Sequence, residues 1–268
     1  MTRIISLVLV GFLVGCGGGS SAETPSTSNT PQEKGQQEDI GYKADKDGKV
    51  KTIKLSSGSA EDIAVSKKAL FVAKGKDGVE IIDIGYKDNI KSELISAING
   101  INAKSVSLSD DGKKLYVVNE QGFVNVIDIS NISAPVKERV TTQQEIQKEI
   151  KTENGKYKFV PRGKDGLEIY SLTDPTNPAL ETIFDKSNAY DVVLADRDTK
   201  ALIAAGATGI NLLDITKPTS PNMVVNFSMP GGTKGLSLNK EQGILFVANG
   251  DKGVLVYSIN IILDKLSK

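Results

Sequence analysis

The chain contains no histidine and no tryptophan, and it has a single cysteine among 268 residues. Without histidine it lacks the usual general base near neutral pH, the commonest metal ligand and the imidazole of a catalytic triad. One cysteine cannot form an internal disulfide bond or a thiolate metal cluster. We therefore expect no cofactor, no metal site and no catalytic residue.

An excess of charge of either sign is also lacking, because 33 basic residues balance 33 acidic ones. A nucleic-acid-binding domain would show a basic stripe or patch, so we expect no nucleic-acid partner. Hydrophobic residues make up 39% of the chain, which is enough for a globular core. We expect that domain to be a monomer.

Long hydrophobic runs are scarce, and the clearest lies at the N-terminus. Residues 4–14 are apolar and follow Arg3. A helix that crosses a bilayer takes about 20 residues, so this run is too short to span one. It is typical of the hydrophobic region of a secretory signal peptide, which we place at residues 1–15.

The four residues "LVGC" at 13–16 close this run. They resemble the lipobox of bacterial lipoproteins. That resemblance implies lipidation of Cys16, cleavage before it and a membrane-anchored protein of the cell envelope. Gly17 replaces the aspartate that retains some lipoproteins at the inner membrane, so the outer membrane is slightly favoured. The alternative is an ordinary signal peptide with an incidental cysteine.

Residues 16–40 are rich in Gly, Ser, Thr, Pro, Gln and Glu. Such a stretch buries too little apolar area to offset the entropy lost on ordering. We interpret it as a polar tether that holds the domain formed by residues 41–268 away from the membrane.

Internal repetition is the strongest signal in that domain. The decapeptide "GKDGVEIIDI" at 75–84 returns as "GKDGLEIYSL", "GATGINLLDI" and "GDKGVLVYSI", and "QGFVNVIDIS" adds a fifth copy. The polar residues near the end of each copy, Asp83, Asp128, Ser171, Asp214 and Ser258, are separated by 45, 43, 43 and 44 residues. This interval is typical of propeller blades.

Each copy contains four short runs rich in Val, Ile, Leu, Phe and Tyr, bounded by Gly, Pro, Asn and Asp. Such runs are strands, and connections this short require antiparallel pairing. We therefore predict an all-β fold, a five-bladed β-propeller of four-stranded antiparallel blades. The five repeats cover about residues 58–102, 103–143, 144–187, 188–231 and 232–260.

These copies resemble the LVIVD family of propeller repeats in their third strand and following loop, and "SLSDDGKKLYVVNE" at 107–120 resembles the related YVTN-type repeats. The resemblance implies the propeller fold. It says little about chemistry, because such families include envelope proteins of many functions.

Ring closure can also be predicted. Residues 50–57, "VKTIKLSS", look like an outer strand without companions, and the last copy lacks a fourth strand. We predict that this run joins the last blade, which removes two open edges. The C-terminal "IILDKLSK" is a rival for that place, or else a short helix.

The third copy departs from the pattern. Lys148, Glu149 and Lys151 stand where other copies have apolar residues, and Pro161 stands where neighbours have Ala73 or Val118. The favoured interpretation is a degenerate blade that packs poorly. The alternative is that the charges face the channel or a partner.

Loops that lead into the innermost strands ring one mouth of a propeller channel. Here they carry mixed charge and one tyrosine, which suits a polar ligand. The candidate binding residues are Glu61, Asp62, Lys104, Tyr190, Asp191 and Lys234. An ordinary hydrated funnel is the alternative.

Other carboxylates have simpler interpretations. The pairs Asp45/Asp47 and Asp196/Asp198 do not complete a calcium loop, so we interpret them as solvated turns. The Asp or Ser at the end of each third strand is expected to cap the following turn.

Three functions remain open. The first is an interaction module that contacts an envelope protein or a glycan. The second is a carboxylate- or metal-dependent hydrolase with a site at the channel mouth, for which three converging carboxylates would be the sign. The third is a structural envelope protein without a specific ligand.

Overall fold

The computed structural model describes residues 43–85, 90–141, 148–229 and 231–264. The predicted signal peptide, Cys16 and the tether lie outside these residues. Twenty strands and one short helix make up the secondary structure of the described ranges. No helical segment within them is long and apolar enough to cross a membrane.

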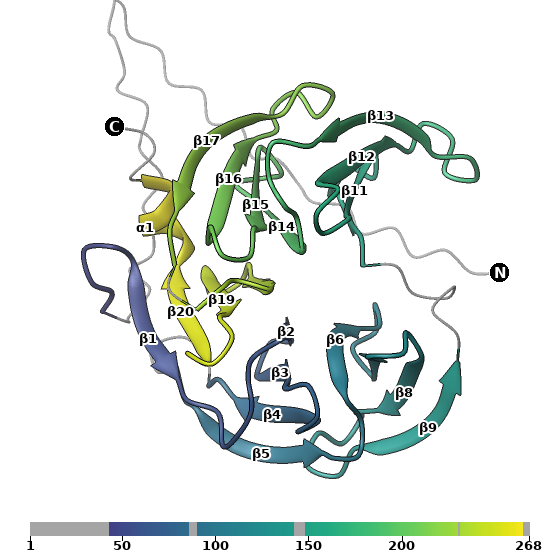
Figure 1. The fold of residues 1–268 in the computed structure, drawn as a ribbon, viewed down its shortest axis with the longest axis vertical. Coiled ribbons are helices and arrows are strands. Elements are labelled where there is room, and N and C mark those ends of the chain that lie inside the picture. Colours follow the sequence, from purple (N-terminus) through teal and green to yellow (C-terminus); the bar gives the residue numbers. More distant parts are fainter. Residues whose placement is uncertain (1–42, 86–89, 142–147, 230, 265–268) are drawn as a thin grey trace, which may run out of the picture. The chain divides into compact units, whose positions relative to one another are not determined.

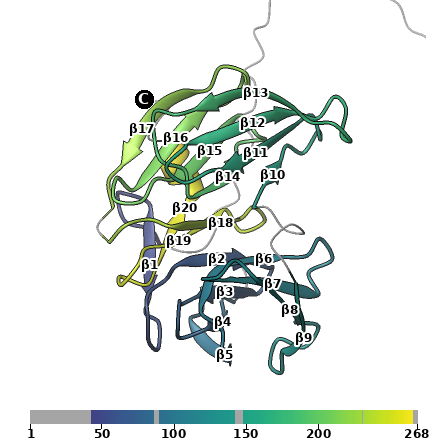
Figure 2. The same ribbon diagram turned by 45° about the vertical axis from the view of Figure 1, so that its right-hand side comes forward.

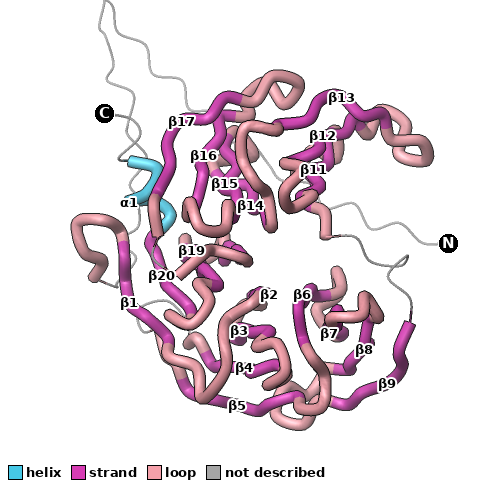
Figure 3. Tube along the Cα trace, viewed as in Figure 1, coloured by secondary structure: helices cyan, strands magenta, loops and turns pink. Residues whose placement is uncertain are grey.

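The strands form five four-stranded sheets arranged as the blades of a β-propeller (Figure 1), which confirms the predicted fold class. Every pairing within the sheets is antiparallel. Figure 3 shows that strands fill the blades and that turns join them at both ends.

Blade 1 contains β2 (Asp62–Val65), β3 (Ala69–Ala73), β4 (Val79–Asp83) and β5 (Glu93–Ile98). Blade 2 contains β6 (Ala103–Leu108), β7 (Lys114–Asn119), β8 (Val124–Asp128) and β9 (Val136–Thr141). Blade 3 contains β10 (Ile150–Lys151), β11 (Tyr157–Pro161), β12 (Leu167–Ser171) and β13 (Ala179–Phe184). Blade 4 contains β14 (Asp191–Ala195), β15 (Lys200–Ala204), β16 (Ile210–Asp214) and β17 (Asn222–Phe227). Blade 5 contains β18 (Gly235–Asn239), β19 (Ile244–Ala248), β20 (Val254–Ser258) and β1 (Lys49–Ile53).

The N-terminal strand closes the ring, as predicted. β1 pairs with β20 in the register Lys51↔Val256, Thr52↔Leu255 and Ile53↔Val254, and both views place the two strands side by side (Figures 1 and 2). The C-terminal rival instead forms helix α1 (Ile259–Asp264), which packs Ile259 and Ile262 against blades 4 and 5. The chain therefore joins its first and last described strands in one sheet, which covers two edges.

Turns between the second and third strands tie neighbouring blades together. In four blades a glycine of this turn exchanges two backbone hydrogen bonds with the next blade, at 2.7–3.2 Å. The bridges are Gly75 with Ala103, Gly163 with Ala189, Gly206 with Thr233 and Gly250 with Ala60. The four glycines have φ between 59° and 67°, a left-handed conformation that other residues adopt at a cost. This requirement explains why four of the copies begin their turn with glycine.

Four buried apolar clusters fill the spaces between blades. They lie between blades 1 and 2, 3 and 4, 4 and 5, and 5 and 1. In blades 1, 3, 4 and 5 the middle residue of the second strand points into one of these clusters, and Phe71, Phe159, Leu202 and Phe246 are completely buried. Burial of such side chains contributes about 1.5–3 kcal/mol each, which makes these junctions the main source of stability.

Blade 3, whose sequence departs from the pattern of the other copies, has a shortened inner strand. β10 has two residues, whereas the first strands of the other blades have four to six. Counting back from Ile150↔Phe159 places Lys148 opposite Pro161. Proline has no N–H to donate, so the ladder stops before this pair. The backbone at Lys148 is thereby released from the sheet.

Candidate functional site

Equivalent positions at the start of the five inner strands meet on the channel axis. Asp62, Ser105, Asp191 and Gly235 pair with Ala73, Val118, Ala204 and Ala248, which occupy matching places on the second strands. Lys148, opposite Pro161, holds the same place in blade 3. We call these five residues the channel ring: Asp62, Ser105, Lys148, Asp191 and Gly235.

Asp62 is almost completely buried and fully hydrogen-bonded. Its Oδ1 accepts from the N–H of Ile63 at 2.8 Å, and its Oδ2 accepts from the hydroxyl of Ser105 at 2.5 Å and the N–H of Val106 at 2.9 Å. The carboxylate thus joins blade 1 to the inner strand of blade 2. Hydrogen bonds to a charged acceptor are stronger than neutral ones, so the contact holds these two strands in register.

Asp191 repeats this arrangement between blades 4 and 5. Its side chain is 2% exposed. Its Oδ1 accepts from the N–H of Val192 at 2.8 Å, and its Oδ2 accepts from the N–H of Leu236 at 2.7 Å. Burial raises the pKa of Asp191 to about 6; the nearby Asp62 adds to the rise, and Lys148 opposes it.

Lys148 connects the two buried carboxylates. Its Nζ lies 2.6 Å from Asp62 Oδ1 and 2.7 Å from Asp191 Oδ2, and its side chain is 30% exposed. Burial alone would lower the pKa of Lys148, but the two carboxylates outweigh this effect and raise it above the usual lysine value. The ammonium is therefore fully charged at physiological pH.

Gly235 makes room for this cluster. A Cβ built on Gly235 would lie 2.4 Å from Asp62 Oδ1, closer than real contacts allow. The channel ring consequently holds two carboxylates, one ammonium, one hydroxyl and one residue without a side chain. Its net charge is −1 when both carboxylates are ionised.

A cavity of about 990 Å³ opens on one side of Lys148. We call it the mouth; its lining includes Glu61, Asp62, Lys104, Ser105, Lys148, Tyr190, Met229 and Lys234. Five of the six residues proposed from the sequence therefore line one cavity. The sixth, Asp191, lines a second cavity on the other side of Lys148.

Two ion pairs stand at the rim of the mouth. Lys234 Nζ lies 2.5 Å from Glu61 Oε2, which links blades 5 and 1, and Lys104 Nζ lies 3.9 Å from Glu120 Oε1. The two lysine side chains are 44% and 41% exposed, so an incoming ligand can reach both. Pairs this exposed add little stability. Their groups are available as donors and acceptors.

Tyr190 supplies an aromatic surface in the mouth. It is 40% exposed, and its ring lies against the backbone at Gly206 and Gly163. A Cβ on Gly206 would come within 2.8 Å of Tyr190 Cε2, so glycine is needed for the ring to lie flat. A fixed aromatic ring between charged pairs suits a ligand with both an apolar face and polar edges.

Two other predictions from the sequence have different outcomes. Asp83, Asp128, Asp214 and Ser171 accept from backbone N–H groups of the following turn, as expected of caps, whereas Ser258 precedes helix α1. Asp45 caps its exposed turn at residues 45–49. The prediction that Asp198 lies in a solvated turn is wrong. Its side chain is 9% exposed, and its carboxylate accepts a hydrogen bond from the N–H of Glu153 in blade 3.

For Lys148 the structure supports the less favoured interpretation, because its ammonium faces the channel. The expected apolar equivalents are wrong for this residue: the matching positions hold the rest of the channel ring. The sequence spacing indicates this position, since the interval between successive residues of the series Asp62, Ser105, Lys148 and Asp191 is 43.

Chemically, the site offers binding groups. In the described ranges, no three His, Cys, Asp or Glu side chains converge to form a metal site.

Comparison with known proteins supports the repeat assignment. A family model for the LVIVD repeat matches residues 57–93 and 100–142, which cover most of blades 1 and 2. These two segments thus match the LVIVD repeat, as the sequence suggested. No curated protein sequence matches the chain.

Solved structures add evidence on the fold alone. A chain in the crystal structure of the mitotic checkpoint complex aligns with 81% of this chain and 96% of its own length, at 10% identity and a TM-score of 0.54. A proposed 6-phosphogluconolactonase from Bacteroides uniformis aligns with 66% of this chain and 60% of its own, at 14% identity. Its TM-score of 0.35 is too low to indicate a shared fold.

Proposed function

We propose that this propeller is a lipid-anchored interaction module of the bacterial cell envelope, which binds a protein or glycan partner through the mouth. The observation that carries the proposal is the grouping of Glu61, Lys104, Tyr190 and Lys234 around one cavity of about 990 Å³. Strand β6 and the loops that lead into blades 1, 4 and 5 supply these residues, so the folded ring is required to bring them together.

The chemistry of the mouth suits a polar ligand of moderate size. The half-exposed ion pairs can donate to and accept from hydroxyl, amide or carboxylate groups, and Tyr190 can pack against an apolar face. Cavities of this volume are typical of small-ligand and peptide sites. A fixed floor made by Lys148 and its carboxylates limits how deeply a ligand enters.

Removal of the tyrosine ring is expected to weaken partner binding most. Aromatic residues at the centre of an interface contribute about 2 kcal/mol or more, so Tyr190→Ala should reduce recovery of the partner about thirtyfold. The measurement is a pull-down from detergent-solubilised envelope, quantified by mass spectrometry. Lys67→Met is the control, because Lys67 is an exposed lysine in the turn between β2 and β3 and is not part of the mouth. Equal recovery by wild type and Tyr190→Ala would contradict the proposed site.

The anchor makes a separate prediction. The "LVGC" sequence at 13–16 supports acylation of Cys16, and two or more acyl chains hold a protein stably at a membrane. In cell fractionation, Cys16→Ala is expected to leave the detergent-soluble lipoprotein fraction. Retention of the variant at the wild-type level would exclude Cys16 as the anchor.

A further inference from the structure

One junction of the ring is built differently from the other four. Tyr116 occupies the middle of β7, the position at which the other blades place Phe71, Phe159, Leu202 and Phe246. Those four side chains are completely buried, whereas Tyr116 is only partly buried and lines a cavity. The residue that should centre the core between blades 2 and 3 is therefore in contact with solvent.

The facing wall of blade 3 is polar as well. Lys158 and Tyr170 pair across β11 and β12 at the place where blade 1 has Leu70 and Ile82, and blade 2 has Leu115 and Ile127. Lys158 lies 5.1 Å from the centre of the Tyr170 ring, and its Nζ is 3.0 Å from Glu149 Oε2. Side chains alternate between the two faces of a strand. Lys158 and Tyr170 therefore lie on the face of blade 3 that points away from the core shared with blade 4.

The turn of blade 2 also lacks the glycine that carries the backbone bridges in the other blades. Glu120 occupies the place of Gly75 in the equivalent turn, and Phe123 occupies the place of Gly78. The four reciprocal glycine bridges join the remaining pairs of neighbouring blades, and the position of blade 3 that corresponds to Ala103 lies outside the described residues. The side chains of the two walls and the composition of this turn thus distinguish the junction between blades 2 and 3 from the other four.

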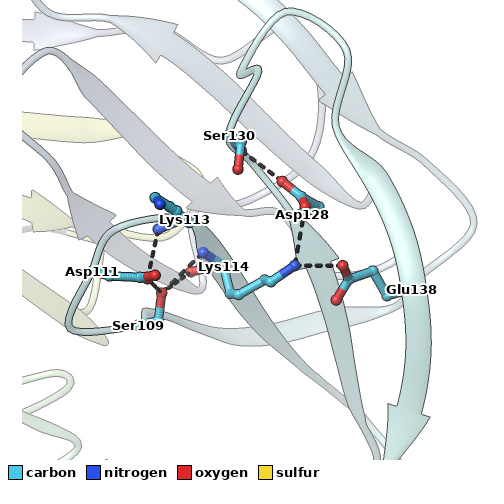
Figure 4. Close-up of polar contacts among 7 residues, drawn as sticks. All are labelled: Ser109, Asp111, Lys113, Lys114, Asp128, Ser130 and Glu138. Carbon is cyan, nitrogen blue, oxygen red and sulfur yellow. Dashed lines mark hydrogen bonds and ion pairs between the residues drawn. The ribbon is translucent and has the colours of Figure 1, made fainter.

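A cavity of about 1080 Å³ comprises the channel, where the inner strands of all five blades line it, together with the adjoining face of blade 2. It extends from the channel beyond Lys148 and across the face of blade 2. We call the part over blade 2 the groove; it is lined by Ser107, Lys114, Tyr116 and Arg139, with Glu149, Ile150 and Pro161 contributed by blade 3. Figure 4 shows its polar wall, in which Lys114 lies between Asp128 and Glu138.

The charges on this wall are present over the whole physiological range. Hydrogen bonds from Ser130 and the ammonium of Lys114 lower the pKa of Asp128 to about 2. Glu138 and Asp128 raise the pKa of Lys114. The side chains of Lys114, Asp128 and Glu138 are 30%, 35% and 37% exposed, so they remain within reach of a ligand.

The geometry points to a second binding site: the groove between blades 2 and 3 takes an extended polypeptide segment that carries both acidic and basic side chains. The charge on the walls decides the class of ligand. Burying these ion pairs under an apolar segment or a lipid would cost their hydration without replacing it. A polypeptide can offer ammonium and guanidinium groups to the carboxylates of these pairs and carboxylate groups to the lysine. Acidic saccharides and nucleic acids offer negative charge only.

The dimensions agree with this occupant. The groove crosses blade 2 from Ser107 on β6 to Arg139 on β9. This path covers three strand spacings, about 14 Å, which is the length of about four residues of extended chain. Tyr116 at its midpoint offers an aromatic face to one side chain of the segment.

The test uses the full chain in detergent and a phage-displayed library of random peptides. Selected peptides are expected to contain both signs of charge, and fluorescence anisotropy should show that Lys114→Gln and Tyr116→Ala each raise the Kd at least about tenfold. Lys200→Gln is the matched control, because Lys200 holds the same place on β15 and makes the same pair with Asp214 at 3.1 Å. It should leave the Kd within about twofold of the wild-type value.

Each contrary outcome is distinct. Failure to select any peptide, or a Kd that neither groove variant changes, overturns the groove as a peptide site. Binding lost in Tyr190→Ala but kept in the groove variants would assign the peptide to the mouth and likewise overturn it, while supporting the proposed function. Selective binding to a saccharide array that depends on Tyr116 would overturn the ligand class. Thermal melting of each variant checks that the ring is folded.

Discussion

Replacing Phe159 with alanine is expected to lower the free energy of unfolding by about 3–5 kcal/mol. Its side chain is completely buried in the cluster between blades 3 and 4, so truncation removes apolar contacts and leaves a cavity. Phe71→Ala and Phe246→Ala should cost a similar amount, because both occupy the same position in their blades. Urea denaturation followed by circular dichroism measures each value.

Tyr116→Ala is the matched control for this series. The residue has the same place on its strand but borders the groove, so the expected cost is about 1 kcal/mol or less. A cost for Tyr116→Ala equal to that of the three phenylalanine variants would show that the junction between blades 2 and 3 is packed like the others.

Lys148→Met is expected to be the most damaging change in the channel. It leaves Asp62 and Asp191 buried without their shared cation, and removing one partner from a buried ion pair costs about 3–5 kcal/mol. Lys234→Met removes a lysine from a half-exposed pair and should cost about 1 kcal/mol or less. Chemical denaturation at pH 8 compares the two.

The cost of Lys148→Met should also depend on pH. The pKa of Asp191 in the folded protein is raised to about 6 by burial, well above its ordinary value of 3.8, and loss of the lysine that opposes this rise moves it further upward. The folded state therefore binds a proton more readily than the unfolded state between these values, so lowering the pH from about 6 towards 4 favours folding. The penalty of the variant should shrink over this range. An equal penalty at pH 8 and pH 4.5 would contradict the role assigned to the two carboxylates.

Repetition made most of the architecture predictable. The intervals of 43–45 residues identify the blades, and an unaccompanied outer strand at 50–57 identifies the ring closure. The clustering of Glu61, Lys104, Tyr190 and Lys234 at one cavity also follows from blade geometry, since equivalent loops of every blade lie at the same end of the channel. These predictions required only local patterns and the symmetry of the ring.

The roles of Lys148 and Tyr116 could not be found in that way. A polar or charged residue in a repeat that departs from the pattern has two possible meanings: loss of packing, or contact with charge or water from a neighbouring blade. The difference depends on what lies across the channel or the junction, namely Asp62 and Asp191 for Lys148, and a polar wall for Tyr116. Those partners are 86 and 43 residues away from Lys148 in sequence. Their proximity is a property of the closed ring.

Thiol accessibility tests the difference between the one open and the four closed junctions most directly. In a background with Cys16→Ser, single substitutions Phe71→Cys, Phe159→Cys, Phe246→Cys and Tyr116→Cys place one thiol in equivalent positions of four blades. With a maleimide reagent under native conditions, Tyr116→Cys should be modified rapidly and the other three only as fast as the protein unfolds. Equal protection of all four thiols would mean that blades 2 and 3 share a closed core and that no groove separates them.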